Sequence, residues 1–560
     1  MSPPTKELMK LTLEQKLAHG GHPVLRWMMD NVYIRTDPAG NVKADKEKST
    51  EKICGAVATI MGLDRAIPVE IIPVLLSTMI DAFFSCKMQK LSVFNSFCIS
   101  MHKLDFFHKF MLYSFHKEEC QMIDTHELKK RDLYLNKIIA FQDTEPVKVV
   151  TGIRRCGKSS LLKLMTFHLK ETGITDDQIL EMNFESHNFK NLTSDSFYEY
   201  VKQHIQPDKR MYLFFDEVQR IPNWEDAINS FRVDFNCDIY VTGSNAYMLS
   251  SEYATYLSGR CVEIKMLPLS FSEFLTFHDF EIRETKSALG GTRKQTFDKT
   301  GEHYELREVF DAYMRFGGMP GIADVGLDQE KALVLLEGIY STVIMRDILE
   351  RENRRGQKRI SDPVLLKKIV MFLADNIGSS ISVSSIGNTL VNEGLLEDGR
   401  RKGTPSAHTV QAYVNALLEA YFFYDIKRFD IKGKEFLRTL GKYYIVDIGL
   451  RNYLLGFSDR DSGHAIENVV YIELLRRGYD VSIGKVDNSE VDFIATKVDD
   501  KLYVQVTESM TSEDVRKREL APLQKISDNY EKIVLSLNTG MDSSYDGIKS
   551  INLIDWLISE

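Results

Sequence analysis

The central part of this 560-residue chain is predicted to form an α/β fold around a parallel sheet. Three short apolar segments indicate its strands: Val147–Thr151, Met211–Phe215 and Ile239–Thr242. Each is followed by glycine or an acidic residue, as buried parallel strands are where they reach a ligand-binding crevice. A helical segment from Ser160 to Lys170 follows the first strand. We therefore expect a parallel sheet with helices on both faces.

A glycine-rich loop joins the first strand to that helix. Residues 152–159 read GIRRCGKS and match the pattern G-x-x-x-x-G-K-[S/T]. Glycines let the backbone turn tightly so that its N–H groups point at phosphate oxygens, and the helix N-terminus adds a favourable dipole. Lys158 would neutralise the β- and γ-phosphates, and the Ser159 hydroxyl would bind Mg²⁺. A chance glycine-rich turn is the alternative. The predicted nucleotide-binding residues are Gly152, Ile153, Arg154, Arg155, Cys156, Gly157, Lys158, Ser159 and Ser160.

Two carboxylates, Asp216 and Glu217, follow the second strand. The C-terminal end of a parallel strand faces the nucleotide crevice, so both side chains are expected near the loop. Asp216 would hold Mg²⁺ through water together with Ser159, and Glu217 would polarise the attacking water. The alternative is that the two residues only begin a solvated loop.

Two further polar residues are candidates for catalysis. Asn245 follows the third strand, where it would sense the γ-phosphate, although it could equally cap the next helix. Arg260 precedes the apolar segment Cys261–Ile264 and could reach a transition-state phosphate within the chain or across a subunit interface. The alternative for Arg260 is an ordinary surface arginine.

Motifs in a fixed order resemble the archaeal and bacterial AAA-type ATPases whose C-terminal half is a domain of unknown function. The resemblance covers approximately Met122 to Glu560 and implies a P-loop fold that binds ATP with Mg²⁺ and hydrolyses it. The physiological task of the family is unassigned. The segments that carry the resemblance are GIRRCGKS, FFDEVQRIPNW, VTGSNAYMLSSEYATYLSGR, LPLSFSEF, Tyr313–Gly321, Val343–Ile348, Lys442–Asp447 and Glu467–Asn468.

The N-terminal part resembles a different family. Residues 11–67 resemble the C-terminal end of the nuclease domain of phage terminase large subunits. We expect helices over 24–32 and 53–66 and a turn at 37–41. Cys54 stands where this resemblance leads us to expect an aspartate that binds metal. Cleavage by two metal ions needs several converging carboxylates, and the upstream ones are not expected here, so the fragment should be inactive.

The stretch from residue 68 to 121 contains no glycine and has no clear periodicity, and we interpret it as a connector. Our hypothesis is that a gene fusion or frame disruption joined the terminase remnant to an ATPase that began near Met122. The expected domains are a terminase remnant (1–67), an atypical connector (68–121), an ATPase core (122–280), a helical linker or lid (281–359), a winged-helix-like unit (360–430) and a nuclease-like domain (431–560).

Residues 360–430 resemble a winged helix-turn-helix. A helix that starts near Ser406 would be its recognition helix, and Arg400, Arg401 and Lys402 just before it would suit DNA phosphates. Such units in ATPases also serve as structural lids or protein-contact modules. DNA is therefore a candidate partner, and a protein partner is the alternative.

The last segment resembles a restriction-endonuclease-like fold, with a helix from Ala465 to Arg477 followed by three strands. Glu467 and Asp492 match the acids that bind metal in active members of that fold. The third motif should read Glu-x-Lys, but the chain has Gln505-Val506-Thr507. This change removes a metal ligand and the lysine, so no nuclease activity is expected.

Bulk properties limit the class of function. The net charge of −9 argues against nucleic-acid binding across the whole chain. Seven cysteines show neither metal-ligand nor disulfide spacing, which favours the reducing cytoplasm. The apolar run Ile71–Ile80 is shorter than the ~20 residues of a spanning helix, so no membrane is expected.

These observations predict a Mg²⁺-dependent ATPase whose nucleotide state controls C-terminal domains that bind DNA or protein. One alternative is an ATP-gated adaptor with little turnover, motivated by the basic clusters at 351–359 and 400–402, although these residues could equally form a solvated helix face. Another is a terminase-related DNA-packaging protein, which residues 11–67 alone suggest. Oligomers are possible in each case.

Overall fold

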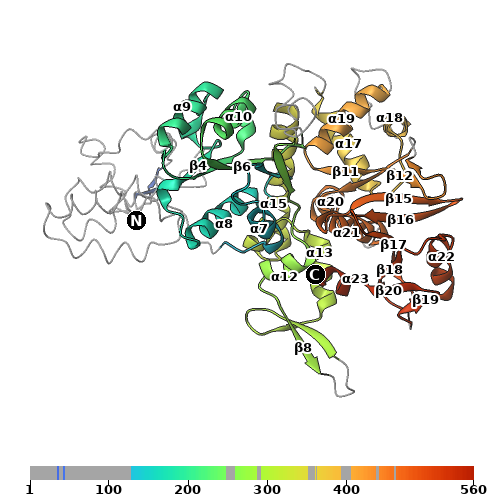
Figure 1. The fold of residues 1–560 in the computed structure, drawn as a ribbon. Helices are drawn as coiled ribbons and strands as arrows, with labels where there is room; N and C mark the ends of the chain where they lie inside the picture. Colours follow the sequence, from blue (N-terminus) through green and yellow to red (C-terminus); the bar gives the residue numbers. More distant parts are fainter. Residues whose placement is uncertain are drawn as a thin grey trace. The chain divides into compact units, whose positions relative to one another are not determined.

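The structure is a computed structural model, and the chain divides into two compact units, Met1–His126 and Glu127–Glu560 (Figure 1). In the first unit, β1 (Ile34–Thr36) and β2 (Val42–Ala44) pair antiparallel on either side of the predicted turn at 37–41. The predicted helices at 24–32 and 53–66, Cys54 and the connector lie outside the described residues. The structure describes residues 34–36, 42–44, 128–246, 259–286, 292–350, 360, 362–392, 405–436, 440–458, 462–540 and 542–559.

A five-stranded, wholly parallel sheet forms the first part of the second unit, in the order β4-β5-β6-β3-β7. The three strands predicted from the sequence are present, as is the predicted helix after the glycine-rich loop. The strands are β3 (Val147–Thr151), β4 (Ile179–Asn183), β5 (Met211–Asp216), β6 (Cys237–Gly243) and β7 (Cys261–Lys265). The helices and short 3₁₀ turns are α7 (Asp132–Ile139), α8 (Lys158–Glu171), η3 (Asp176–Gln178), η4 (His187–Phe189), α9 (Ser194–His204), η5 (Val218–Arg220) and α10 (Trp224–Asp234).

Successive residues of these strands point to opposite faces of the sheet, and both faces are covered. Val150 and Phe214 belong to the hydrophobic core that includes α7 and α8. Val149 and Leu213 belong to a separate core with α9 and α10. The strands are therefore apolar on both faces, which is why they read as continuous hydrophobic runs. The predicted parallel sheet with helices on both faces is confirmed.

The region 281–359 differs in part from the helical linker that the sequence predicts. Its first residues form β8 (Glu281–Lys286), β9 (Thr292–Phe297) and β10 (His303–Tyr304), an antiparallel sheet whose hairpin projects from the body (Figure 1). The helical prediction is wrong there because threonines favour strands and the Gly290-Gly291 pair between β8 and β9 is a hairpin signal. Before and after the hairpin lie α12 (Phe271–Phe277), α13 (Leu306–Phe316), α14 (Gly321–Val325), α15 (Gln329–Thr342) and the π-helical η7 (Val343–Glu350).

Two adjacent glycines join this region to the C-terminal half. A Cβ on Gly318 would lie 2.4 Å from the Leu269 carbonyl oxygen, and one on Gly317 would lie 2.3 Å from Oδ1 of Asp447. The Gly318 N–H donates to Oδ2 of Asp447 at 2.6 Å, and the Leu450 N–H donates to Oδ1 at 3.1 Å. Asp447 thus caps a helix and holds the glycine backbone. Its burial raises its pKa to about 6.

Four helices and a pair of antiparallel strands follow among the described residues. An isolated β-bridge joins Ile381 to Gly441, beside the antiparallel pair of β11 and β14. Three helices followed by such a pair of strands is the order of elements in a winged helix-turn-helix. Ser406 caps the third helix, where the sequence predicts its start, but that helix contains no lysine or arginine. The basic residues at 351–359 and 400–402 lie outside the described residues. The elements are α17 (Pro363–Asp375), α18 (Val383–Asn392), α19 (Ala407–Glu419), β11 (Phe423–Ile426), β14 (Lys442–Ile445) and α20 (Ile448–Leu455).

An eight-stranded mixed sheet completes the chain in the order β13-β12-β15-β16-β17-β18-β20-β19. The predicted helix and the three strands after it are present as α21, β15, β16 and β17, and β18 runs parallel to β17. The elements are β12 (Arg428–Asp430), β13 (Glu435–Phe436), α21 (Ser462–Arg476), β15 (Asp480–Val486), β16 (Ser489–Thr496), β17 (Lys501–Ser509), α22 (Glu513–Gln524), β18 (Glu531–Asn538), β19 (Ser544–Tyr545), β20 (Ile548–Asn552) and α23 (Leu553–Ile558).

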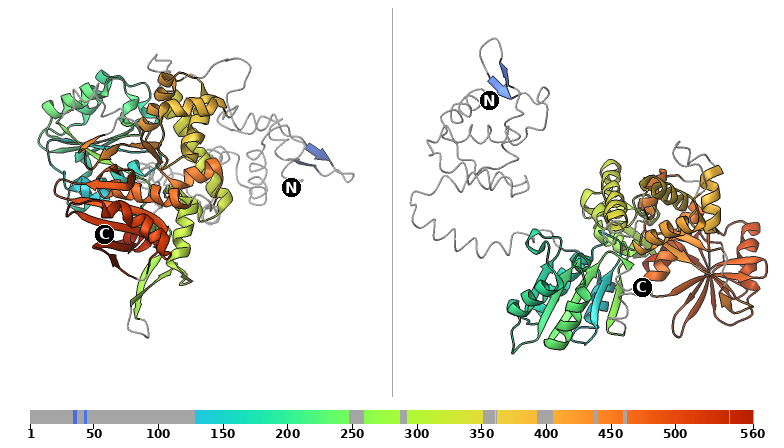
Figure 2. Two further views of the ribbon diagram at one scale, coloured as in Figure 1. Left: turned by 90° about the vertical axis from the view of Figure 1, so that its right-hand side faces the viewer. Right: turned by 90° about the horizontal axis from the view of Figure 1, so that it is seen from above.

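One hydrophobic core runs through the second unit from α7 to α23. Figure 2 shows the ribbon of these elements from two further sides. The core includes Tyr134 beside the parallel sheet, Leu366 of α17 and Leu557 at the C-terminus. The two sheets are therefore held by continuous packing. No helix in the described part of the chain is long and apolar enough to cross a membrane.

Candidate functional site

The backbone of the glycine-rich loop requires its glycines. Gly152 has φ 142° and Gly157 has φ 103°, both in a region that residues with a side chain rarely adopt. A Cβ on Gly152 would also lie 2.1 Å from the Met266 carbonyl oxygen. Gly157 is the N-cap of the 14-residue helix α8. The loop therefore lies between the end of β3 and a helix N-terminus, which is the geometry of a phosphate-binding site.

Lys158 lies inside this loop. Its side chain is buried, and Nζ donates to the carbonyl oxygens of Gly152 at 3.0 Å and Ile153 at 3.1 Å. The far side of the loop is also held, because Nη1 of Arg131 donates to the Cys156 carbonyl oxygen at 3.0 Å. The ammonium group is thus fixed where it can meet an anion bound by the loop.

Asp216 is placed against Ser159. The carboxylate accepts hydrogen bonds from the Thr242 hydroxyl and from Nδ2 of Asn183, the last at 2.9 Å, and the Ser159 hydroxyl is near enough to lower its pKa. Burial raises the pKa of Asp216, while these hydroxyls and the charge of Lys158 act against the increase. A hydroxyl and a carboxylate that meet beside the loop are hard oxygen ligands of the kind Mg²⁺ prefers. The two residues predicted to hold the metal are therefore adjacent and fit it.

Glu217 is the next residue, and its side chain is held by two donors. Nε2 of Gln219 donates to Oε2 at 2.7 Å, and Nη2 of Arg154 lies 3.4 Å from the same oxygen. The backbone has φ 57°, and its N–H donates to Oγ1 of Thr242 at 2.8 Å. Thr242 thus contacts both acidic residues. Sequence reasoning missed Thr242 and Gln219, although Thr242 ends a predicted strand.

Arg154 contacts more acidic groups than the sequence suggests. It pairs with Asp347 of η7, with a shortest N–O distance of 3.0 Å, and with Glu185 after β4 at 3.0 Å. Arg220 shares Glu185 at 2.8 Å. Asp347 lies in a segment that carries the resemblance to AAA-type ATPases, but the sequence gives it no role.

Asn245 and Arg260 lie at opposite ends of the parallel strands, Asn245 at their C-terminal ends and Arg260 at their N-terminal ends. Asn245 is buried in the loop after β6. Because Thr151 of β3 pairs with the last residue of β6, this loop and the glycine-rich loop follow the C-terminal ends of neighbouring strands. Arg260 is exposed, and its carbonyl oxygen accepts from the N–H of Val147 at the start of β3. Val147 and Thr151 are about 13 Å apart along an extended strand. Arg260 is therefore not brought to the loop within the chain, and its action across an interface stays a prediction.

The acidic residues predicted for the C-terminal domain lie together, but a lysine joins them. Nζ of Lys442 lies 2.9 Å from Oε1 of Glu467 and 2.8 Å from Oε1 of Glu490. Burial and the charge of Glu467 raise the pKa of Asp492 well above its ordinary value. Gln505, which replaces the expected glutamate, donates to Glu519 at 3.1 Å. Among the described residues, no group of three or more His, Cys, Asp or Glu side chains could hold a metal ion.

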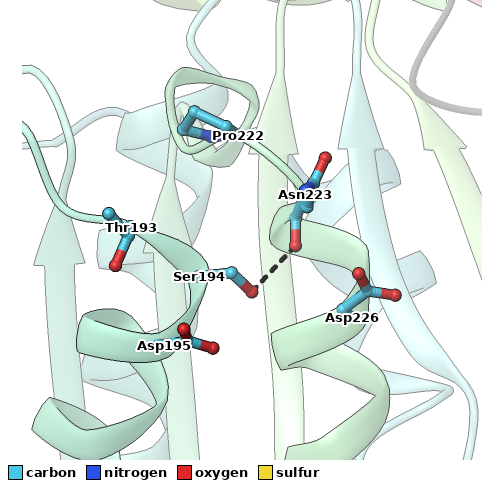
Figure 3. A pocket seen from close by; sticks show the side chains of 6 residues that line it. All are labelled: Thr193, Ser194, Asp195, Pro222, Asn223 and Asp226. Atoms are coloured by element: carbon cyan, nitrogen blue, oxygen red, sulfur yellow. Dashed lines mark hydrogen bonds between the residues drawn. The ribbon is translucent and has the colours of Figure 1, made fainter.

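A separate hollow of about 380 Å³ opens between the N-termini of α9 and α10 (Figure 3). The hydroxyl of Ser194 donates to the Asn223 carbonyl oxygen at 3.0 Å across it. Two carboxylates lie in its wall, so it does not suit a phosphate group. Its lining residues are Thr193, Ser194, Asp195, Pro222, Asn223 and Asp226, none of which belongs to the glycine-rich loop.

Three stretches of the chain match known families. Residues 144–275 match the family described as AAA domain. Residues 307–461 match a domain of unknown function, DUF8612. Residues 1–70 match the terminase large subunit endonuclease domain.

Individual relatives cover the same parts. An uncharacterized protein of Haemophilus influenzae is 37% identical over 430 residues, which is 76% of this chain and 98% of the relative. An uncharacterized protein of Methanocaldococcus jannaschii is 29% identical over 438 residues, covering 76% of this chain and 90% of the relative. The terminase large subunit of Enterobacteria phage HK97 is 41% identical over 66 residues, which is 12% of this chain and 13% of the terminase.

Among solved structures, a Walker-type ATPase of Pyrococcus abyssi aligns with a TM-score of 0.39 and 14% identity, over 58% of this chain and 95% of that one. The resemblances to AAA-type ATPases with a C-terminal domain of unknown function and to terminase large subunits are confirmed by the family matches. The chain belongs to the family of the Haemophilus influenzae protein, and it contains an AAA domain and a DUF8612 domain preceded by a terminase large subunit nuclease fragment.

Proposed function

We propose that this protein binds ATP with Mg²⁺ at residues 152–159, hydrolyses it, and transmits the nucleotide state to its C-terminal domains. The observation that carries the proposal is the contact of Ser159 with Asp216 beside a loop whose lysine is already in place. The match to an AAA domain over 144–275 supports it.

Each residue of the site has a physical role in this proposal. The loop N–H groups and Nζ of Lys158 bind the phosphates, and Ser159 and Asp216 hold the metal. Mg²⁺, when bound, spreads the negative charge of the β- and γ-phosphates. Oε2 of Glu217 accepts a proton from the attacking water, and Asn245 contacts the γ-phosphate from the loop after β6.

Contacts between the glycine-rich loop and the C-terminal half support transmission. The hydroxyls of Thr151 and Tyr421 both donate to Oε1 of Glu263, so the last residue of β3 is joined to the strand region after α19. Arg131 holds the loop carbonyl of Cys156 and also the Pro268 carbonyl oxygen, to which Arg476 of α21 donates at 2.6 Å. A shift of the loop would therefore change contacts of both C-terminal domains.

The partner at those domains is DNA or a protein. The winged-helix order of α17 to β14 motivates DNA, but the exposed side chains of α19 include His408, Gln411 and Asn415 and no cation, so phosphate contacts would come from 351–359 and 400–402. An ATP-gated adaptor with little turnover is the alternative. We propose a cytoplasmic location from the scattered cysteines. The terminase role is weaker because the matching fragment spans 13% of the phage terminase and has Cys54 where aspartate is expected.

The test compares ATP turnover and ATP affinity in the parent chain, Glu217→Gln and a matched control, Glu171→Gln, at the exposed end of α8. We expect Glu217→Gln to bind ATP as the parent does and to turn it over roughly a hundredfold or more slowly. The control should match the parent. Unchanged turnover in Glu217→Gln would remove this carboxylate from the mechanism. Tight binding without turnover in the parent would favour the adaptor.

A further inference from the structure

Asp347 lies in the match to the domain of unknown function, yet its side chain reaches the glycine-rich loop of the AAA domain. The carboxylate is buried in η7, a stretch of π-helical turns that directly follows α15. Nε of Arg154 donates to Oδ1 at 3.2 Å and to Oδ2 at 3.1 Å, and Nη2 donates to Oδ1 at 3.0 Å. A guanidinium held along one edge by both oxygens of a carboxylate has a fixed plane.

The remaining hydrogen-bonding groups of Arg154 point to two other carboxylates. Nη1 donates to Oε1 of Glu185 at 3.0 Å, and Nη2 lies 3.4 Å from Oε2 of Glu217. The same Nη2 that contacts Asp347 therefore contacts the proposed proton acceptor. Its direction toward Glu217 depends on the bond to Asp347, because rotation of the guanidinium out of this plane would break both contacts.

The Asp347 carboxylate and the Arg154 guanidinium meet in a buried environment, where a charge pair has a desolvation cost. Burial raises the pKa of Asp347, while the hydrogen bonds and charge of Arg154 act to lower it. Three carboxylates surround the guanidinium of Arg154, a residue of the loop itself. If the position of Asp347 served only for packing, an apolar side chain would stabilise the fold at least as well, because buried ion pairs contribute little net stability.

We propose that Asp347 is a positioning residue of the nucleotide site, which holds the Arg154 guanidinium so that Nη2 orients the Glu217 carboxylate for hydrolysis. This inference rests on the proposed ATPase function. It also assigns the domain of unknown function a part in the reaction, because the AAA domain alone lacks this carboxylate.

Asp347 acts only through Glu217 in this scheme, which makes a double-variant test decisive. Asp347→Asn keeps the shape but removes the charge that holds Arg154. We expect its kcat to fall roughly tenfold to a hundredfold, as for a misplaced reacting group, with ATP affinity unchanged. The matched control Asp324→Asn, at an exposed position of α14, should keep the parent kcat.

The second arm repeats Asp347→Asn in the Glu217→Gln background. The pair of changes should be no slower than Glu217→Gln alone, because the group that Asp347 positions is already absent. A purely structural role would slow both backgrounds by the same factor. If Asp347→Asn does not fold, Arg154→Lys replaces it, since lysine keeps the charge beside the loop but loses the planar fork.

Parent-like turnover in Asp347→Asn or Arg154→Lys would overturn the inference, as would an equal loss in the Glu217→Gln background. A loss of affinity with unchanged kcat would also contradict it. Unchanged turnover in Glu217→Gln would also overturn the inference, whereas no ATP binding or turnover by the parent chain would contradict the proposed function, so the two failures are distinguishable.

Discussion

A buried ion pair near the start of β3, the strand that leads into the glycine-rich loop, gives a sharp test of what holds this strand in place. Lys148 of β3 and Asp238 of β6 are both completely buried, and Nζ of Lys148 donates to Oδ1 of Asp238. Oδ2 of Asp238 accepts from the Tyr240 hydroxyl at 2.7 Å and from the Asp143 N–H at 2.8 Å. Nζ of Lys148 also donates to the Thr144 carbonyl oxygen at 2.9 Å. The pair therefore ties the strand that leads into the loop to its neighbour.

Lys148→Met leaves the buried carboxylate of Asp238 without its cation. Removing one partner of a buried pair costs about 3–5 kcal/mol of unfolding free energy, because the remaining charge is left uncompensated. Asp238→Asn should cost somewhat less, because burial already lowers the pKa of Lys148 and the amine can lose its proton. The loss of unfolding free energy in the double variant should be smaller than the sum of the two single losses, by at least about 2 kcal/mol.

Native-state hydrogen exchange at amides of β3 and β6 measures this cost locally, without treating the whole chain as one cooperative unit. Lys209→Met, which breaks the exposed Lys209–Asp177 pair, is the matched control and should change nothing measurable. The reasoning would be refuted if both single variants lost less than about 1 kcal/mol of unfolding free energy, or if the loss in the double variant equalled the sum of the two single losses.

Two further predictions concern the loop and a partly buried histidine. Gly152→Ala should abolish ATP binding, because its Cβ would meet the Met266 carbonyl oxygen and its φ is unfavourable; a titration with ATP that shows parent affinity would contradict this. Burial and the charge of Lys129 lower the pKa of His278 to about 4, so the folded state holds fewer protons than the unfolded state below the ordinary value near 6.5. Stability should fall as the pH drops from about 6.5 to 4, by at most about 3 kcal/mol, relative to His278→Gln in parallel unfolding curves; identical pH profiles would contradict it.

The sequence predicted those parts of the site that are local in the chain. The glycines, Lys158 and Ser159 occupy one loop, and the physics of phosphate binding restricts each of them. Asp216 was predictable because it ends a buried parallel strand, whose C-terminal end must lie at the loop edge. The resemblance to AAA-type ATPases then extended the fold to the C-terminal half.

Contacts between distant segments could not be predicted in this way. Asp347 is 193 positions from Arg154 and meets it only because α15 and η7 pack back toward the loop. Arg260 is a candidate by its place before an apolar strand. The parallel register of β7 with β3 places it at the N-terminal ends of these strands, away from the glycine-rich loop. The sequence did not predict the hairpin at 281–304, because its strands are short and helices lie before and after it.

The central claim is that residues 152–159 bind ATP, and equilibrium titration with ATP and Mg²⁺ tests it most directly. The parent chain would be compared with Lys158→Ala and with the control Lys163→Ala, an exposed lysine of α8. We predict that the parent and the control bind ATP equally and that Lys158→Ala binds at least about tenfold more weakly, since it loses the cation held inside the loop. Equal binding by all three chains, or no binding by the parent, would contradict it.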